Sequence, residues 1–178
     1  MKALLISADG FEDMELFYPS YRLKEEGWKV TLAAPKMGVI TGKHAYGADV
    51  DMALEDVNPE GYDLLIVPGG KAPEEVRLNQ DALDIIRWFM DARRPVAAIC
   101  HGAQALISAG VVKGRDMTCW KGVRDDLIAA GANYHDDEVV VDGNLVTSRM
   151  PGDLPAFMRE TFKVVASQAS ARTRKKAA

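Results

Sequence analysis

The segment best suited to chemistry lies at residues 95–104 and has the sequence PVAAICHGAQ. A short apolar run ends at Cys100, and His101 and Gly102 open a predicted helix. In open α/β proteins, a parallel strand delivers its last residue to the carboxyl edge of the sheet, where ligands bind. The amides and the positive dipole end of the following helix favour a thiolate, which is the reactive form of cysteine. The pattern therefore predicts that Cys100 is a nucleophile.

A cysteine that attacks a carbonyl also needs a proton shuttle, donors for the oxyanion and a group that orients the base. His101 is one of three histidines and stands beside the cysteine, so we predict that it is the general acid and base. Pro68-Gly69-Gly70 ends another apolar run, and glycines let the backbone approach a substrate closely. The amides of Gly70 and His101 are therefore the predicted oxyanion hole.

Each of these residues also has a purely structural interpretation. A free cysteine is often simply buried, a first-turn histidine often caps its helix, and paired glycines often form only a turn. Their combination at strand ends favours the catalytic interpretation, in the manner of a nucleophile elbow. Such a turn predicts a strained Cys100 backbone with positive φ. His44 and His135 lie in loop or hairpin segments and are assigned no role. Cys119 is a resolving thiol only if the fold brings it near Cys100.

Glu15 differs from the other acidic residues of the first predicted helix because Pro19 follows it by four positions. Proline has no N–H, so the carbonyl of residue 15 loses its helical partner and the helix is expected to bend. A helix bent toward the active edge would hold the Glu15 carboxyl against Cys100. There it must be protonated to donate a hydrogen bond to a thiolate. Glu12 and Asp13 are interpreted as complementing the helix dipole.

Composition and motifs exclude several classes of protein. The 178 residues suffice for one domain with a full core, and 48% hydrophobic with 27% charged residues is ordinary for a globular chain. The net charge of -4 argues against a nucleic-acid partner. The N-terminal apolar run is too short for a signal peptide or a membrane span. Two cysteines suit a reducing, cytoplasmic compartment. No motif indicates a metal or a cofactor, so we predict neither.

Apolar runs alternate with helical patterns along the chain, which predicts an α/β sandwich with a parallel sheet and helices on both faces. Asp142-Gly143 lies between apolar arms and predicts a β-hairpin added to the sheet. One domain is expected over residues 1–168, followed by a basic, frayed tail at 169–178. The expected strands are 2–7, 29–34, 63–67 and 96–99, the expected helices are 12–26, 79–92, 101–109, 123–130 and 153–169, and the expected hairpins are 39–51 and 139–148.

These features resemble the PfpI family of intracellular cysteine proteases, within the superfamily of the parkinsonism-associated protein deglycase. The likeness runs from Met1 to about residue 168. Its most specific part is Ala98-Ile-Cys-His-Gly102, with Pro68-Gly-Gly70 about thirty residues earlier. The other matching segments are Phe11-Glu-Asp-x-Glu15 with Pro19, Gly38-Val-Ile-Thr-Gly-Lys-His44, Ala72-Pro-Glu74, Arg124-Asp-Asp126, Val139-Val-Val-Asp-Gly143 and Thr147-Ser-Arg149.

The resemblance implies a flavodoxin-like fold with Cys100 as nucleophile and His101 as its partner. It further implies that Glu74 reaches His101 from a neighbouring subunit of a dimer or hexamer, and that Glu15 is the protonated carboxyl beside the cysteine. From the residues alone, Glu74 would be only a solvated glutamate in a short helical turn. The predicted pocket also includes Glu12, Gly69, Lys43 and Trp120. Some relatives carry an aromatic hydroxyl where this chain has Trp120, and an indole cannot replace it.

Two functions from different classes follow. The first is a cysteine hydrolase in stress protection, acting either on peptides or on small dicarbonyls and glycated side chains. We favour the small substrates because no peptide-binding edge is recognisable. The second is a redox-responsive stress protein whose Cys100 is oxidised to sulfinate. A glutamine amidotransferase-like hydrolase would need a distant histidine near the C-terminal strands, and none follows His135.

Overall fold

The computed structural model describes residues 1–177, with side chains as far as Ala169. Within this part of the chain, the central sheet has seven strands in the order β10-β11-β7-β6-β1-β2-β5. All neighbours are parallel except β10 and β11, which form an antiparallel hairpin at one edge. The strands are β1 (Lys2–Ile6), β2 (Lys29–Ala34), β5 (Met52–Ala53), β6 (Leu64–Val67), β7 (Val96–Ile99), β10 (Val139–Asp142) and β11 (Leu145–Ser148).

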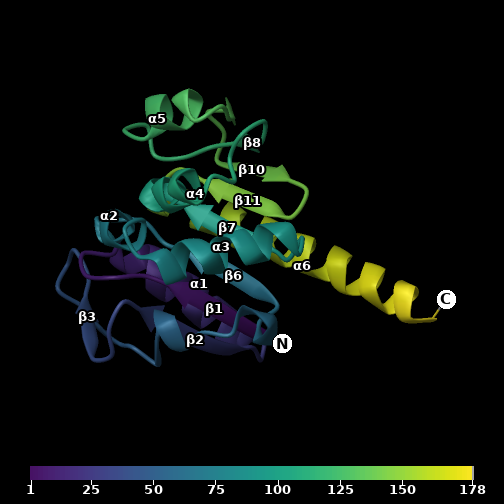
Figure 1. Ribbon diagram of the computed structural model, residues 1–178, viewed down its shortest axis with the longest axis horizontal. Helices are drawn as coiled ribbons and strands as arrows, with labels where there is room; N and C mark the ends of the chain where they lie inside the picture. The colour runs from purple at the N-terminus through teal and green to yellow at the C-terminus, as the bar shows by residue number, and fades with distance from the viewer. Residues whose placement is uncertain (178) are drawn as a thin grey trace.

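The inner strands are buried along their whole length, which explains their continuous apolar sequences. Every residue of β6 and β7 is buried, as is β1 after Lys2. Such runs are typical of parallel strands that helices cover on both faces. The helices α1 (Asp13–Glu25) and α6 (Leu154–Ala177) pack together, and α2 (Ala72–Val76), α3 (Gln80–Asp91) and α4 (Ala103–Ala109) form a second packed group (Figure 1). The predicted sandwich and the implied flavodoxin-like architecture are confirmed.

Two small sheets lie outside the central one. β3 (Val39–Thr41) and β4 (Gly47–Asp49) form the predicted hairpin between residues 39 and 51. β8 (Asp116–Met117) and β9 (Asn133–Tyr134) form a short parallel pair that the sequence did not predict. The helix α5 (Arg124–Ala129) lies beside this pair and contacts α4 (Figure 1).

The last helix is longer than expected. α6 continues through the segment predicted as a tail and ends at Ala177 (Figure 1), while Ala178 and the side chains from residue 170 onward lie outside the described part of the chain. No helix in the described residues has both the length and the apolar composition that a membrane crossing requires.

The strand order determines where a ligand can bind. Among the longer parallel strands, β1 lies between β2 and β6, so the chain turns back across the sheet after β2. The order of strands reverses at β1 and β6, and ligands of open α/β sheets bind at the carboxyl ends of strands at such a switch point. The loops after β1, β6 and β7 meet at this edge. The first two are joined because Phe11 forms an antiparallel bridge with Gly70.

Candidate active site

Cys100 lies at the carboxyl end of β7, in a strained turn. Its φ is 62°, inside the left-handed region that side chains other than glycine rarely adopt. The strain predicted for this position is therefore confirmed. A short 3-10 turn, Cys100–Gly102, leads from the strand into α4. Cys100 is 8% exposed as a residue, and its sulfur lies 3.3 Å from Nδ1 of His101.

Glu15 is fully buried on α1 beside the sulfur of Cys100. Its Oε2 accepts a hydrogen bond of 2.8 Å from the main-chain N–H of Gly69. Its Oε1 is buried without a nitrogen or oxygen partner in the described residues, so the neighbouring thiol is the contact left for it. Burial raises the pKa of Glu15 to about 8. The carboxyl is therefore protonated at neutral pH and has a proton to donate toward sulfur.

The electrostatics of Cys100 differ from the sequence-based prediction of a resting thiolate. Burial raises the pKa of the thiol, and a carboxylate at Glu15 would raise it further. The main-chain amides of His101 and Gly70 hydrogen-bond the sulfur and lower the pKa, but burial outweighs them. The prediction was wrong because it counted the amides and not the loss of water around the sulfur. The group at rest is a thiol, and the two amides offset part of the cost of ionising it.

His101 has the properties of a base for that thiol. Burial lowers the pKa of its imidazole, a nearby Glu74 carboxylate raises it, and the Lys43 ammonium lowers it again. The lowered pKa keeps the ring neutral at neutral pH, and a neutral ring can accept a proton. Trp120 lies against this ring with centroids 6.2 Å apart, and its main-chain N–H donates to the carbonyl of Cys100.

A cavity of about 440 Å³ opens beside the imidazole of His101 and the backbone of Gly70. Its volume is in the range of small-molecule sites. Glu74 reaches the cavity from α2 of the same chain, and no hydrogen bond joins it to His101 within the described residues. The lining residues are Gly10, Lys43, Gly70, Lys71, Glu74 and His101.

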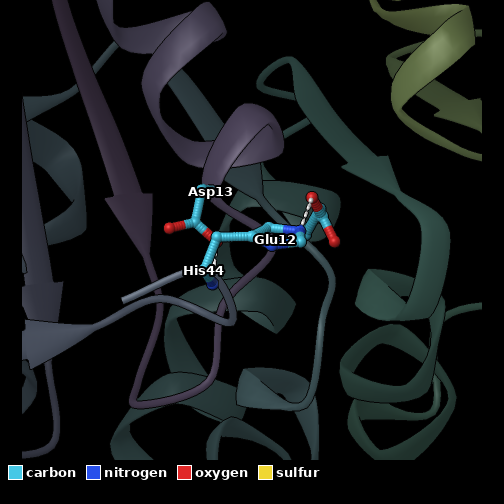
Figure 2. Close-up of side chains that lie close together, drawn as sticks. All are labelled: Glu12, Asp13 and His44. Carbon is cyan, nitrogen blue, oxygen red and sulfur yellow. Dashed lines mark hydrogen bonds and ion pairs between the residues drawn. The ribbon is translucent and has the colours of Figure 1, made fainter. Parts of the chain in front are cut away.

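The wall of the site beside α1 is formed by Glu12 and the tip of the β3–β4 hairpin. Figure 2 shows the imidazole of His44 beside the Glu12 carboxylate, at 3.7 Å. Lys43 Nζ lies 3.3 Å from the same carboxylate, and the carboxylate of Asp13 accepts the main-chain N–H groups of His44 and Tyr46. Asp13 thus holds the hairpin against α1, which corrects its interpretation as a helix-dipole residue alone.

Oxygen and nitrogen atoms of Glu12, Asp13 and His44 come within 4.8 Å of one another, a spacing that a metal ion could bridge (Figure 2). These atoms already have partners. Asp13 binds two amides, and the ammonium of Lys43 occupies the place of a cation beside Glu12. We therefore assign the cluster a structural role. His44 was assigned no role from the sequence. Its place beside Lys43 at the tip of the predicted hairpin is the feature that could have indicated its contacts with Glu12 and Asp13.

The structure thus brings most of the predicted site residues to one edge of the sheet. The sulfur of Cys100 is surrounded by His101, Glu15, Gly69 and Gly70. Glu12, Lys43, Glu74 and Trp120 lie around them. Cys119 is different, because it is fully buried and burial raises its pKa to about 12. A fully buried thiol is not accessible to a disulfide partner, and within the described residues Cys119 has no hydrogen bond to a histidine, so nothing supports a resolving role for it.

The raised pKa of Glu15 predicts a pH-dependent stability. The folded chain holds this proton up to about pH 8, whereas the ordinary carboxyl releases it near 4.5. Between these values the folded state binds more protons, so the stabilisation present at low pH is lost as pH rises through about 8. Glu15→Gln imitates the protonated acid. We expect the wild type to lose stability relative to Glu15→Gln as pH rises. Urea unfolding of both proteins near pH 4.5 and above pH 8 measures this loss.

The comparison of wild type with Glu15→Gln isolates this carboxyl, because every other titrating group is present in both proteins. A difference in unfolding free energy that does not change with pH would show that Glu15 titrates normally. Alkylation of Cys100 across the same pH range gives a second measurement. Loss of the Glu15 proton places a negative charge beside sulfur, so the wild-type profile is expected to lie at higher pH than that of Glu15→Gln.

Known proteins match this chain over most of its length. A family model described as the DJ-1/PfpI family matches residues 1–164. The sequence is 56% identical over 165 residues to Deglycase PfpI of Pyrococcus furiosus, covering 93% of this chain and 99% of that protein. It is 41% identical over 165 residues to the Bacillus subtilis protein named "Putative cysteine protease YraA", covering 92% of this chain and 98% of that protein.

Solved structures show the same fold. DJ-1beta of Drosophila melanogaster superposes with a TM-score of 0.85 and 29% identity, over 93% of this chain and 89% of that one. A two-domain protein of Anabaena variabilis, with dj-1/thij/pfpi-like and ferritin-like domains, gives a TM-score of 0.89 and 32% identity over 94% of this chain. This chain spans 48% of that two-domain protein.

Proposed function

Because this chain belongs to the DJ-1/PfpI family, we propose that it is a cysteine-dependent enzyme acting on small dicarbonyls and on side chains that dicarbonyls have modified. The names of its relatives, a deglycase and a protein named as a cysteine protease, suggest a hydrolase-type enzyme. One observation carries the proposal: a strained cysteine whose sulfur lies 3.3 Å from an imidazole and beside a fully buried carboxyl.

The first chemical step joins the sulfur to the substrate. His101 takes the proton of the Cys100 thiol as the sulfur adds to the aldehyde carbon of a 2-oxoaldehyde, and the carbonyl oxygen becomes negatively charged. The amides of Gly70 and His101 already point at the sulfur, so they are the nearest donors for that oxygen. Return of the proton from His101 to the oxygen completes a hemithioacetal.

The remaining steps convert the adduct into a hydroxy acid. A proton leaves the former aldehyde carbon and another is added at the neighbouring ketone carbon, which yields a thioester of Cys100 with no net change in oxidation state. Water then cleaves the thioester and the sulfur regains its proton. Neutral His101 is the base placed for the proton transfers, and the Glu15 proton stabilises the sulfur as it leaves.

The size of the cavity supports small substrates over extended peptides. A cavity of about 440 Å³ accommodates a dicarbonyl or the end of a modified side chain. Proteolysis would require a groove for several residues on each side of the cut bond. The direct test supplies methylglyoxal and an unstructured peptide to the purified protein, with NMR detection of lactate and mass spectrometry of fragments. Fragments without lactate would overturn the proposal.

The likeness to the family also supports a role for a second copy of the chain. Glu74 of the same chain lies near His101 without a hydrogen bond to it. We propose that in a dimer or hexamer Glu74 of a neighbouring copy completes the triad by binding the imidazole. Mixing a Glu74→Gln chain with a His101→Ala chain tests this role, because a trans arrangement restores activity at one class of site.

A redox-sensing role for Cys100 is the second candidate. The observation in its favour is that a protonated Glu15 and the two amides around sulfur would also stabilise a sulfinate. His101→Ala separates the two functions. We expect turnover of methylglyoxal to fall about 100-fold or more, because the base is lost. The rate at which hydrogen peroxide oxidises Cys100, followed by mass spectrometry, should change little.

The same variant can contradict the catalytic proposal. Turnover that survives in His101→Ala would remove the imidazole from the mechanism and favour the sensing role. Thermal unfolding of the variant serves as the control for folding, since His101 is only half-buried and its ring contacts Trp120 at the surface of the site.

A further inference from the structure

Two lysines line the cavity, and they differ in whether a carboxylate pairs with them. Lys43 lies in the β3–β4 hairpin with its Nζ 3.3 Å from Glu12 Oε2, so a neighbouring carboxylate offsets its charge. The side chain of Lys71 makes no ion pair or hydrogen bond within the described residues. An ammonium that lines a concave site and makes no ion pair there attracts an anion from solution.

The base of the Lys71 side chain is held in place. The main-chain N–H of Lys71 donates to the carbonyl of Gly10 at 2.7 Å, next to the bridge between Phe11 and Gly70. The Cβ of Lys71 packs closely on Gly10, because a methyl group added at Gly10 would lie only 3.1 Å from it. The position of Lys71 beside the oxyanion donor Gly70 is therefore fixed by the backbone.

The cavity also holds one carboxylate, and it faces the imidazole. Glu74 lines the cavity together with His101, and its carboxylate raises the pKa of the imidazole. The cavity therefore has a carboxylate beside the imidazole and, at the start of α2, an ammonium that makes no ion pair within the described residues. A substrate with its carbonyl at Cys100 and an anionic group at its far end matches this distribution.

We infer that Lys71 forms a subsite for a carboxylate and that the preferred substrates are 2-oxoaldehydes bearing an anionic group remote from the reacting carbonyl. The inference rests on the proposed function and adds the substrate class to it. A partly exposed ion pair contributes up to about 1 kcal/mol, so the preference is modest and sensitive to salt.

A matched pair of substrates tests the subsite. Phenylglyoxal and 4-carboxyphenylglyoxal differ only by the remote carboxylate. We expect the wild type to show a kcat/KM about threefold to fivefold higher for the carboxylated compound. Lys71→Met should remove this preference, Lys71→Glu should reverse it, and added salt should shrink it. Lys29→Met is the control. It removes one exposed positive charge at the amino end of β2, at the end of the sheet opposite to the cavity, and should preserve the preference.

A second pair of reagents keeps the subsite testable without turnover. N-phenylmaleimide and N-(4-carboxyphenyl)maleimide both alkylate Cys100, and the ratio of their rates reports the same carboxylate contact. If neither glyoxal is consumed but the rate ratio depends on Lys71, the proposed function fails and the subsite stands. Two results would overturn the subsite. One is an equal kcat/KM for the two glyoxals together with equal alkylation rates for the two maleimides in the wild type, and the other is a preference that survives Lys71→Met.

Discussion

Replacement of Cys100 by alanine is expected to abolish turnover of methylglyoxal and leave a folded protein. The sulfur is the atom that forms the bond to substrate, and the other described thiol, Cys119, is fully buried and has no hydrogen bond to a histidine within the described residues. Loss of a nucleophile costs about 10⁴-fold or more in kcat. Initial rates of lactate formation, with thermal unfolding in parallel, measure the two properties separately.

Cys119→Ala is the matched control for this experiment. It removes the other cysteine of the chain from a core position, and we expect a loss of about 1 kcal/mol in stability with activity retained. Activity that persists in Cys100→Ala, or disappears in Cys119→Ala, would place the nucleophile elsewhere.

The backbone at Cys100 allows a further comparison within the same series. Alanine and cysteine both pay the steric penalty of a φ of 62°, and glycine does not. Cys100→Gly is therefore expected to be more stable than Cys100→Ala by about 1 kcal/mol, in spite of its more flexible unfolded chain. Such a result would show that the fold stores strain in order to present a side chain at this turn.

Patterns within single segments predicted the fold well. The runs at residues 29–34 and 96–99 became strands with those bounds, and the Asp142-Gly143 turn joined the two strands of the predicted hairpin. These features depend on local chemistry: apolar residues covered on both faces, and a turn that requires glycine. The same logic placed Cys100 and Gly70 at strand ends on neighbouring strands, which was enough to locate the active edge.

Contacts between distant segments were harder to predict. Glu15 was correctly expected beside Cys100, but the ionisation of the thiol was not, because it depends on how much water the folded chain removes. The pairing of Glu12 with Lys43 and the anchoring of the hairpin by Asp13 join residues about thirty positions apart. No period or turn signal encodes such contacts. Burial and long-range pairing are properties of the assembled fold.

Gly70→Ala should damage both stability and activity far more than an ordinary glycine substitution. Gly70 has a φ of 81°, and an added Cβ would lie 2.3 Å from the main-chain N of Glu12 and 2.4 Å from the main-chain O of Gly10. These are backbone atoms of the bridge that joins the loops after β1 and β6, so they cannot move aside independently. We expect a destabilisation of about 3 kcal/mol or more, measured by urea unfolding.

Gly27→Ala separates the two causes of that loss. Gly27 follows the C-cap of α1 with a φ of 76°, close to that of Gly70, and an added Cβ would meet nothing within 4 Å. Its substitution carries only the left-handed penalty of about 1 kcal/mol. Equal destabilisation of the two variants would mean that the loops after β1 and β6 yield to the methyl group. A large difference, with activity lost only in Gly70→Ala, would show that this contact between the loops holds the Gly70 amide against the sulfur.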